Sequence, residues 1–233
     1  MNIFVLTGAG ISAESGLGTF RDKDGLWTRY DLNEVATPQG YARDPAKVRA
    51  FYSARRANLA TAQPNAAHLA LAQLQTGLAQ RGGTLFLCTQ NVDDLHERAG
   101  SSGVVHMHGE LAVTRCDACA ATWPDAAPLS ADSACPACGR LGTARPHVVW
   151  FGEEPLFLDQ IDEALQDADL FVAIGTSGSV YPAAGFVSQA RQWGIATLEI
   201  NLEPSDGARA FDQRLYGPAS QIVPAWVEEM LKA

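Results

Sequence analysis

Short apolar runs that alternate with helical segments constrain the fold of this chain more than any other feature. Six runs are expected to be strands, several of them unbroken stretches of aliphatic and aromatic side chains: residues 2–7, 84–89, 104–106, 170–174, 196–200 and 221–223. Strands that are apolar on both faces are typical of a parallel sheet covered by helices on each side. Helical segments are expected between them: 65–80, 155–168 and 182–193. This alternation predicts an α/β fold with a doubly wound parallel sheet.

Two stretches depart from the alternation and are expected to form a smaller module beside the sheet. One is helical without a strand, with a helix beginning at Asp44-Pro45, and the other is rich in Ala, Pro, Asp and Cys. We therefore expect a sheet domain made of residues 1–30, 76–113 and 145–233, with a helical insert at 31–75 and a cysteine-containing insert at 114–144. A ligand is expected in the crevice between the two parts, at the carboxyl ends of the strands.

Composition limits the partners of the protein. No segment of the 233 residues approaches the roughly 20 apolar residues of a membrane span, so no membrane partner is expected. The net charge of −9 makes a nucleic-acid backbone an unfavourable partner, whereas a lysine-rich protein surface is compatible with it. The apolar start lacks the basic flank and cleavage site of a signal peptide, so we expect a cytoplasmic protein, with a monomer as the default.

The first expected strand runs into a glycine-rich loop, Gly8-Ala9-Gly10-Ile11-Ser12-Ala13-Glu14-Ser15-Gly16. Glycines let the backbone approach a phosphate, and the N-terminus of a following helix supplies N–H donors and partial positive charge. The usual dinucleotide pattern is Gly-x-Gly-x-x-Gly, but Ala13 holds the third glycine position here. The loop therefore predicts a nucleotide site that differs from that of a plain dehydrogenase.

Four of the five cysteines form two Cys-x-x-Cys pairs, Cys116 with Cys119 and Cys135 with Cys138, separated by 15 residues. This spacing is typical of a zinc ribbon, in which each pair places two sulfurs on one ion. A redox dithiol is the alternative, but two pairs in an aperiodic segment favour a metal. Because four thiolates fill a tetrahedral Zn²⁺, we expect the ion to be structural. The fifth cysteine, Cys88, lies in an apolar run and is expected to be a buried packing residue.

Polar residues follow two of the expected strands. Gln90, Asn91 and Asp93 come after the second strand, and His106 and His108 lie at the end of the third. Doubly wound sheets bind ligands at such positions. For the first group a helix cap is the alternative, although capping does not account for all three residues. His108, at a strand tip beside a glycine, is a candidate general base because histidine titrates near neutrality, with a structural histidine as the alternative.

Taken together, these motifs resemble those of the sirtuins, the NAD-dependent protein lysine deacylases. The resemblance extends from residue 7 to about residue 220 and includes, in order, Gly8-Ala9-Gly10-Ile11-Ser12 with Phe20-Arg21, Thr89-Gln90-Asn91-Val92-Asp93, His108-Gly109, the four cysteines, Gly175-Thr176-Ser177 and Asn201-Leu202-Glu203. It implies a Rossmann-like NAD-binding domain with a small domain built from the helical insert and a zinc ribbon.

The resemblance implies roles for individual residues. The implied NAD-binding residues are Gly8, Ala9, Gly10, Ile11, Ser12, Glu14, Ser15, Phe20, Arg21, Trp27, Gln90, Asn91, Val92, Asp93, Gly175, Thr176, Ser177, Asn201, Leu202, Glu203 and Ala219. Asn91 and Asp93 would also take part in catalysis, with His108 as the base. The acyl-lysine carbonyl oxygen would attack the ribose carbon that bears nicotinamide, and His108 would accept a proton from the ribose hydroxyls. The products would be free lysine, nicotinamide and O-acyl-ADP-ribose.

One subgroup is resembled more closely, the bacterial and mitochondrial-type deacylases that remove acidic acyl groups. Tyr52 and Arg55 are three residues apart, so they share a helix face, where a phenol and a guanidinium can together bind a terminal carboxylate. Ala36 would leave room for the longer acyl chain, and Val148 and Phe151 would line part of an apolar tunnel. This implies both deacetylation and desuccinylation.

Alternatives to this function follow from the same residues. Helix geometry alone would leave Arg55 on a solvated face, where Arg56 is also expected. The protein would then be mainly a neutral-acyl deacetylase, or a protein ADP-ribosyltransferase on the same scaffold. A silent NAD-binding sensor is disfavoured by the intact base candidate. The acylated lysine is expected to arrive on an extended peptide, which the run Val148-Val149-Trp150 could pair with by strand addition.

Overall fold

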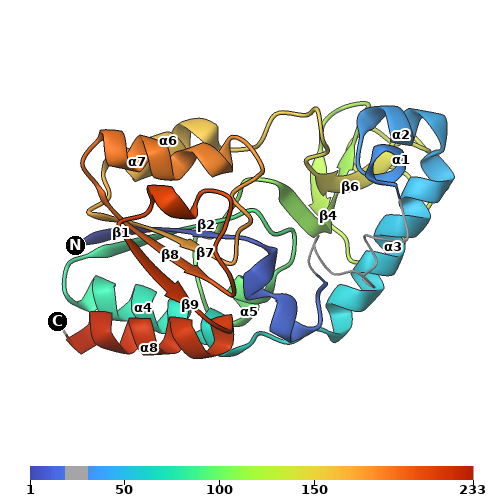
Figure 1. Cartoon of the computed structure of the whole chain (residues 1–233). Coiled ribbons are helices and arrows are strands. Elements are labelled where there is room, and N and C mark those ends of the chain that lie inside the picture. The colour runs from blue at the N-terminus through green and yellow to red at the C-terminus, as the bar shows by residue number, and fades with distance from the viewer. Residues whose placement is uncertain (19–30, 233) are drawn as a thin grey trace.

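The computed structural model describes residues 1–18 and 31–232. The chain forms a larger part, a sheet with helices on both faces, and a smaller part that joins helices α1 to α3 with a second sheet (Figure 1). Both chain ends lie at the end of the sheet part that is remote from the smaller part (Figure 1). Within the described residues, no helix combines the length and apolar character that crossing a membrane requires.

The larger sheet is parallel throughout its described strands, in the order β3-β2-β1-β7-β8-β9. These strands are β1 (Asn2–Thr7), β2 (Thr84–Thr89), β3 (Val105–His106), β7 (Leu170–Ile174), β8 (Ala196–Asn201) and β9 (Gln213–Tyr216). The order reverses between β1 and β7, and this switch point is where doubly wound sheets bind ligands. The predicted fold class is confirmed.

Helices cover both faces of this sheet because successive strand residues point in opposite directions. The covering helices are α4 (Ala66–Gln80), α6 (Leu158–Gln166), α7 (Phe186–Gln192) and α8 (Ala219–Lys232). Ile3 and Val5 lie in the core formed with α4 and α8, whereas Phe4 and Leu6 lie in the core formed with α6 and α7. Figure 1 shows the two helix pairs on opposite sides of the strands. The short elements on this part are α5 (Leu95–Arg98), η1 (Ala9–Ile11), η2 (Ala13–Ser15), η4 (Ala183–Gly185) and η5 (Ala208–Ala210).

Helix α4 forms where it was predicted, with the Asn65 side chain capping its first turn. Its residues Ala67, Leu71 and Leu74 are buried in the core beneath the sheet. Residues 66–75 therefore pack against the sheet, although they were expected to belong to the helical insert.

One predicted strand is wrong. Residues 221–223 belong to α8, and the sixth strand of the sheet is β9. In α8 the buried residues Val223, Trp226 and Val227 recur at helical spacing, so a short apolar run that suggested a strand is one turn of an amphipathic helix. Strand β9 escaped prediction because each of its side chains is exposed, which leaves no apolar run at this sheet edge.

The smaller part combines α1 (Leu32–Val35), α2 (Pro38–Arg43) and α3 (Pro45–Thr61) with an antiparallel sheet of order β5-β4-β6. Its strands are β4 (Gly109–Cys116), β5 (Thr122–Pro124) and β6 (Ala144–Val148). Helix α3 begins as predicted, with Asp44 capping its first turn and Pro45 at the first helical position.

Arg56 connects α3 to the second sheet. It was expected on a solvated face, but it is only 4% exposed. Its guanidinium donates to the carbonyl oxygens of Leu111 (2.8 Å) and Ala127 (2.6 Å) and to Thr114 Oγ1 (2.8 Å), and it pairs with Asp125 at 3.5 Å. A buried cation is tolerated here because its N–H groups donate to these oxygen atoms and Asp125 supplies the opposite charge.

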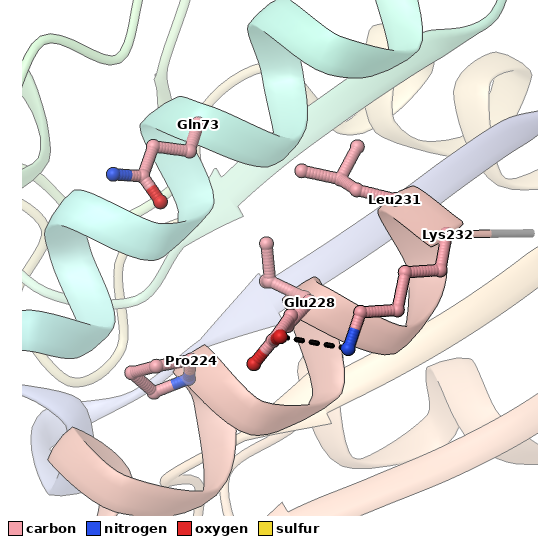
Figure 2. A pocket seen from close by; sticks show the side chains of 6 residues that line it. Gln73, Pro224, Glu228, Leu231 and Lys232 are labelled. Atoms are coloured by element: carbon pink, nitrogen blue, oxygen red, sulfur yellow. Dashed lines mark ion pairs between the residues drawn. The ribbon is translucent and has the colours of Figure 1, made fainter.

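A surface pocket lies between α4 and α8 (Figure 2). Its lining residues are Gln73, Pro224, Val227, Glu228, Leu231 and Lys232, and an ion pair of 2.7 Å joins Glu228 to Lys232. None of the residues predicted for the functional site lines this pocket.

Candidate active site

The loop after β1 packs directly against the loop after β7. The N–H of Gly8 donates to the carbonyl of Ile174 (3.0 Å), and the N–H of Gly10 donates to the carbonyl of Gly175 (2.8 Å). A Cβ atom on Gly10 would lie 2.7 Å from Gly175 Cα, and one on Gly8 would lie 2.8 Å from Gly175 O. The two loops thus require glycine for their mutual contact. The helix expected after this loop is absent from the described residues that follow it, where the short turns η1 and η2 form instead.

Side chains from the loops after β2 and β8 extend this contact. Gln90 Nε2 donates to Thr176 Oγ1 (2.9 Å), and Asn201 Nδ2 donates to the carbonyl of Thr176 (2.8 Å). Asn91 Nδ2 donates to the carbonyl of Gly8 (3.2 Å). Four loops at the carboxyl ends of neighbouring strands are therefore joined by hydrogen bonds.

Asp93 and Asn91 are both bound to Ser12 of the glycine loop. Asp93 is 7% exposed, and its carboxylate accepts from Ser12 Oγ (3.0 Å) and from the N–H of Leu95 (3.2 Å). Asn91 Nδ2 donates to Ser12 Oγ at 3.2 Å. Burial raises the pKa of Asp93, while the hydrogen bonds from Leu95 and Ser12 oppose the rise. The residues predicted for catalysis and for the cofactor loop thus form one buried polar group.

His108 lies just beyond β3 and faces the same loop. Its Nδ1 is 3.1 Å from the carbonyl oxygen of Gln90. A carbonyl only accepts hydrogen bonds, so Nδ1 carries the proton and Nε2 of the neutral ring is an acceptor. Burial lowers the pKa of His108, which keeps the ring neutral at pH 7. This tautomer and charge are those a general base needs.

His106, two residues earlier, is engaged on both nitrogens. Its Nδ1 is 3.2 Å from the carbonyl oxygen of Asn91, and its Nε2 is 2.8 Å from Glu97 Oε1. Burial alone would lower the pKa of His106, but the hydrogen bond and the charge of Glu97 raise it overall. His106 therefore supports the backbone of the Asn91 loop and does not present a free base.

Two further buried histidines lie beneath the site. His68 is fully buried, with Nε2 3.4 Å from Ser12 Oγ. Its ring lies 4.9 Å from that of His96, whose Nε2 is 3.0 Å from Thr7 Oγ1. The sequence contained one usable signal: His68 stands three residues after the cap Asn65, and its Nδ1 accepts the N–H of that residue (3.3 Å) in a capping box.

The residues predicted to bind the acyl chain come together in the smaller part. Ala36, Tyr52 and Val148 lie in one buried cluster with Trp150, and Val92 of the predicted cofactor set packs against it. The buried cluster and the loop after β2 therefore meet at Val92. Phe151, also predicted for the tunnel, is 49% exposed and does not belong to this buried cluster.

The backbone of the run Val148-Val149-Trp150 is largely committed within the molecule. The donated bonds are Val149 N–H to His108 O (2.9 Å), Trp150 N–H to Glu153 Oε2 (2.9 Å) and Phe151 N–H to Ala36 O (2.9 Å). These N–H groups cannot also donate to a peptide. The predicted strand addition would have to use other groups of this segment.

Arg55 lies above the aromatic rings of its own helix. Its Cζ atom is 5.5 Å from the ring centre of Tyr52 and 5.8 Å from that of Phe51. Burial lowers the pKa of Arg55, and attraction to Tyr52 and Asp93 opposes the change, so the guanidinium stays charged. The shared helix face predicted for Tyr52 and Arg55 is present.

The other predicted NAD residues divide into three groups. Glu14 accepts from the N–H (2.9 Å) and Oγ (2.7 Å) of Ser220 at the start of α8, and Ser15 Oγ accepts from Asn65 Nδ2 (3.0 Å). Leu202 and Glu203 are exposed after β8, whereas Ser177 and Ala219 are half-buried. Phe20, Arg21 and Trp27 lie outside the described residues.

The four paired cysteines come together as predicted. Their sulfur atoms all lie within 4.8 Å of one another, with 3.8 Å between Cys116 and Cys138 and 3.7 Å between Cys119 and Cys135. A tetrahedral ion with Zn–S bonds of about 2.3 Å has sulfur–sulfur edges of about 3.8 Å, so the cluster fits zinc. Four sulfurs leave no position for a reacting water, which makes the ion structural. Cys88 is buried, and burial raises the pKa of its thiol, as expected for a packing residue.

The glycine loop meets its partner loop at the switch point of the sheet, and a neutral histidine faces the same edge. This arrangement defines the class of the protein: a nucleotide-dependent enzyme with a doubly wound sheet and a structural zinc site in its smaller part.

Comparison with known proteins identifies the family. A sequence model of the Sir2 family matches residues 8–182, and the chain belongs to this family. A relative from Caulobacter vibrioides named NAD-dependent protein deacylase is 74% identical over 99% of this chain and 97% of its own length. The enzyme class expected from the sequence, an NAD-dependent protein deacylase, is confirmed.

Solved structures agree with this assignment. A Sir2 homologue in complex with NAD is similar with a TM-score of 0.89 and 42% identity, over 99% of this chain and 90% of the other. A Sir2 variant with a deacetylated p53 peptide and 3′-O-acetyl ADP ribose has a TM-score of 0.81 and 27% identity, over 98% of this chain and 93% of the other.

Proposed function

We propose that this deacylase removes both acetyl and succinyl-type groups from protein lysines, with His108 as the base and Arg55 and Tyr52 as the receptor for an acyl carboxylate. The proposed removal of succinyl-type groups rests on the position of Arg55. Its charged group lies over Tyr52 and within electrostatic reach of Asp93, next to the loop that bears the catalytic residues. A neutral acyl group needs no such cation.

The residues that would hold NAD are those of the joined loops after β1, β2, β7 and β8. When bound, NAD supplies the ribose carbon that accepts the acyl oxygen as nicotinamide leaves. Gly8, Gly10 and Gly175 let the loops after β1 and β7 pack directly against each other. A backbone without side chains can also approach a pyrophosphate closely. Asn91 and Asp93, fixed by Ser12, would orient the nicotinamide end.

His108 would act through Nε2. Its Nδ1 proton is held by the Gln90 carbonyl, so the opposite nitrogen can accept a proton from a substrate hydroxyl. The apolar cluster of Ala36, Val148 and Trp150 would exclude water from the acyl group, which strengthens electrostatic interactions at the reacting atoms.

Tyr52 and Arg55 would share the distal carboxylate. Burial raises the pKa of Tyr52, so the phenol stays protonated and can donate a hydrogen bond. The guanidinium offers a planar fork that matches a carboxylate. Hydrogen bonds to charged groups contribute about 1.5–3 kcal/mol each, which is enough to select acidic acyl chains.

The test compares peptides carrying acetyl-lysine or succinyl-lysine, incubated with NAD and followed by mass. Wild-type enzyme is expected to convert both. Arg55→Met should lower kcat/KM for the succinyl peptide roughly 10–100-fold more than for the acetyl peptide, since it loses the fork. Arg55→Lys, which keeps the charge without the fork, should fall between the two.

Each alternative predicts a different result. An equal loss of kcat/KM on both peptides would show that Tyr52 and Arg55 do not bind a carboxylate, and the enzyme would then be a neutral-acyl deacetylase. A peptide whose mass rises by ADP-ribose would indicate a protein ADP-ribosyltransferase. We also expect the enzyme to act on extended peptides as a monomer in the cytoplasm, where reducing conditions keep the cysteine cluster available to zinc.

A further inference from the structure

Trp150 ties the Tyr52 hydroxyl to the rest of the smaller part. Its Nε1 donates to Tyr52 OH at 2.9 Å, and both side chains are at most 2% exposed. The indole N–H only donates, whereas a phenol oxygen has two acceptor positions and one proton. The bond fills one acceptor position, fixes the oxygen and turns the phenol proton away from Trp150.

A partly buried ion pair holds the indole in place. Arg145, 3% exposed, forms two parallel hydrogen bonds with Glu153, of 2.7 and 2.9 Å. The Arg145 guanidinium lies over the Trp150 ring, with Cζ 3.4 Å from the ring centre. Glu153 also accepts the backbone N–H of Trp150 (2.9 Å). Burial would raise the pKa of Glu153, but hydrogen bonds from Arg145 and Trp150 lower it overall, so the carboxylate stays ionised.

A second aromatic residue limits movement of the indole further. The ring centre of Tyr41 lies 5.1 Å from that of Trp150, and Arg49 donates to the Tyr41 hydroxyl at 2.9 Å. The indole is thus held by its ring contacts, its backbone and its N–H.

We infer that Trp150, held by the Arg145–Glu153 pair, is a positioning residue that aims the Tyr52 hydroxyl and thereby sets the preference of the enzyme for acyl groups ending in a carboxylate. This inference rests on the proposed function, in which Tyr52 and Arg55 bind that carboxylate. Trp150 touches neither the reacting atoms nor the carboxylate; it acts through Tyr52.

Trp150→Phe is the direct test, because phenylalanine keeps an aromatic ring beneath Arg145 but has no N–H. The readout is the ratio of kcat/KM for succinyl-lysine to that for acetyl-lysine peptide, measured on one preparation so that the folded fraction cancels. We expect the ratio to fall about fivefold to tenfold, as for the loss of one hydrogen bond, mainly through a higher KM for the succinyl peptide.

A double-mutant cycle with Tyr52→Phe separates positioning from packing. If Trp150 acts through the hydroxyl, Trp150→Phe should leave the ratio unchanged once the hydroxyl is absent. An equal effect of Trp150→Phe in both backgrounds overturns the inference while the proposed function stands. If Tyr52→Phe alone leaves the ratio at the wild-type value, the carboxylate receptor itself is wrong and the inference fails with it.

Glu153→Gln tests the ion pair. The amide can still accept the Trp150 N–H but loses the bidentate pair with Arg145, so the ratio should fall in the same direction by a smaller factor. An unchanged ratio in Glu153→Gln overturns the role given to the pair.

Discussion

The five histidines of the chain differ in what their partners leave available. His106 is held by Glu97 and the Asn91 carbonyl, and His96 is so buried that its pKa falls well below 6.5. His108 alone combines a proton-bearing Nδ1, fixed by Gln90, with a position at the strand tip. Local hydrogen bonding thus decides which imidazole can serve as the base, although all titrate alike in a free peptide.

The pH dependence follows from the environment of His108. A base works unprotonated, and burial lowers the pKa of His108 below 6.5, so activity is lost only as pH falls through that lowered value. We expect the acid limb of kcat/KM for an acetyl-lysine peptide to have its midpoint below pH 6.5. An acid limb centred above pH 6.5 would contradict this assignment.

Replacing the base gives a second residue-scale prediction. His108→Ala should reduce deacylation about 10²–10⁴-fold, the usual contribution of general base catalysis. His147→Ala, at a half-buried histidine on β6 outside the joined loops, is the matched control and should lose far less. Full activity in His108→Ala would show that the base is another group.

Sequence reasoning reached site residues that lie at strand ends but missed those that support them. Asn91 and Asp93 could be predicted because the apolar run of a buried parallel strand shows in the sequence where the carboxyl end of that strand lies. The bonds from Arg56 to strand β4 and from Trp150 to Tyr52 join segments 55 and 98 positions apart. No local pattern predicts such pairs, because only the assembled fold brings their donors and acceptors together.

At the scale of elements, the glycine loop owes its sequence to packing between loops. Gly10→Ala would place a Cβ atom 2.7 Å from the backbone of Gly175, so one of the loops must move. We expect the free energy of unfolding in urea to fall by about 1–3 kcal/mol, with weaker NAD binding. Gly185→Ala is the control, because its nearest neighbour would be 3.6 Å away and its φ of −83° suits alanine. It should change stability by less than about 1 kcal/mol.

Helix α3 depends on one arginine for its contact with the second sheet. Arg56→Met would leave the carbonyl oxygens of Leu111 and Ala127 without their donor and Asp125 without its cation. We expect a loss of roughly 3 kcal/mol or more in urea unfolding. Arg43→Met, at an exposed arginine of α2, should stay within about 0.5 kcal/mol of wild type. Equal effects of the two changes would refute the role given to Arg56.

Among elements, the central strands were predictable and the edge of the sheet was not. Strands β1, β2 and β7 each contain an unbroken apolar stretch because helices cover both faces, and this stretch is recognisable in the sequence. Strand β9 lies at the edge with exposed side chains, so nothing distinguishes it from a loop. The apolar run 221–223 was assigned in its place because three residues cannot separate a strand from one helical turn.

At the scale of the whole molecule, the two parts of the chain are stabilised in different ways. The sheet part has apolar cores on both faces, whereas the cysteine-containing segment of the smaller part depends on its metal. Removing zinc with a chelator should release one ion per chain and abolish deacylation while most sheet structure remains by circular dichroism. Co²⁺ should restore activity, since the ion takes no part in the reaction. Undiminished activity without metal would contradict a structural role.

The contact between Glu14 and Ser220 joins two segments that are 206 positions apart. A carboxylate at the start of a helix stabilises its first turn. Glu14 of the glycine loop supplies this carboxylate to α8. Binding of a ligand to the glycine loop should therefore change the stability of the first turns of α8. Adding NAD is expected to slow amide hydrogen exchange in the first turns of α8, and Glu14→Ala should abolish this response while leaving protection in α4 unaltered. The final helix would then serve as a built-in reporter of cofactor binding, available to mass spectrometry without any label.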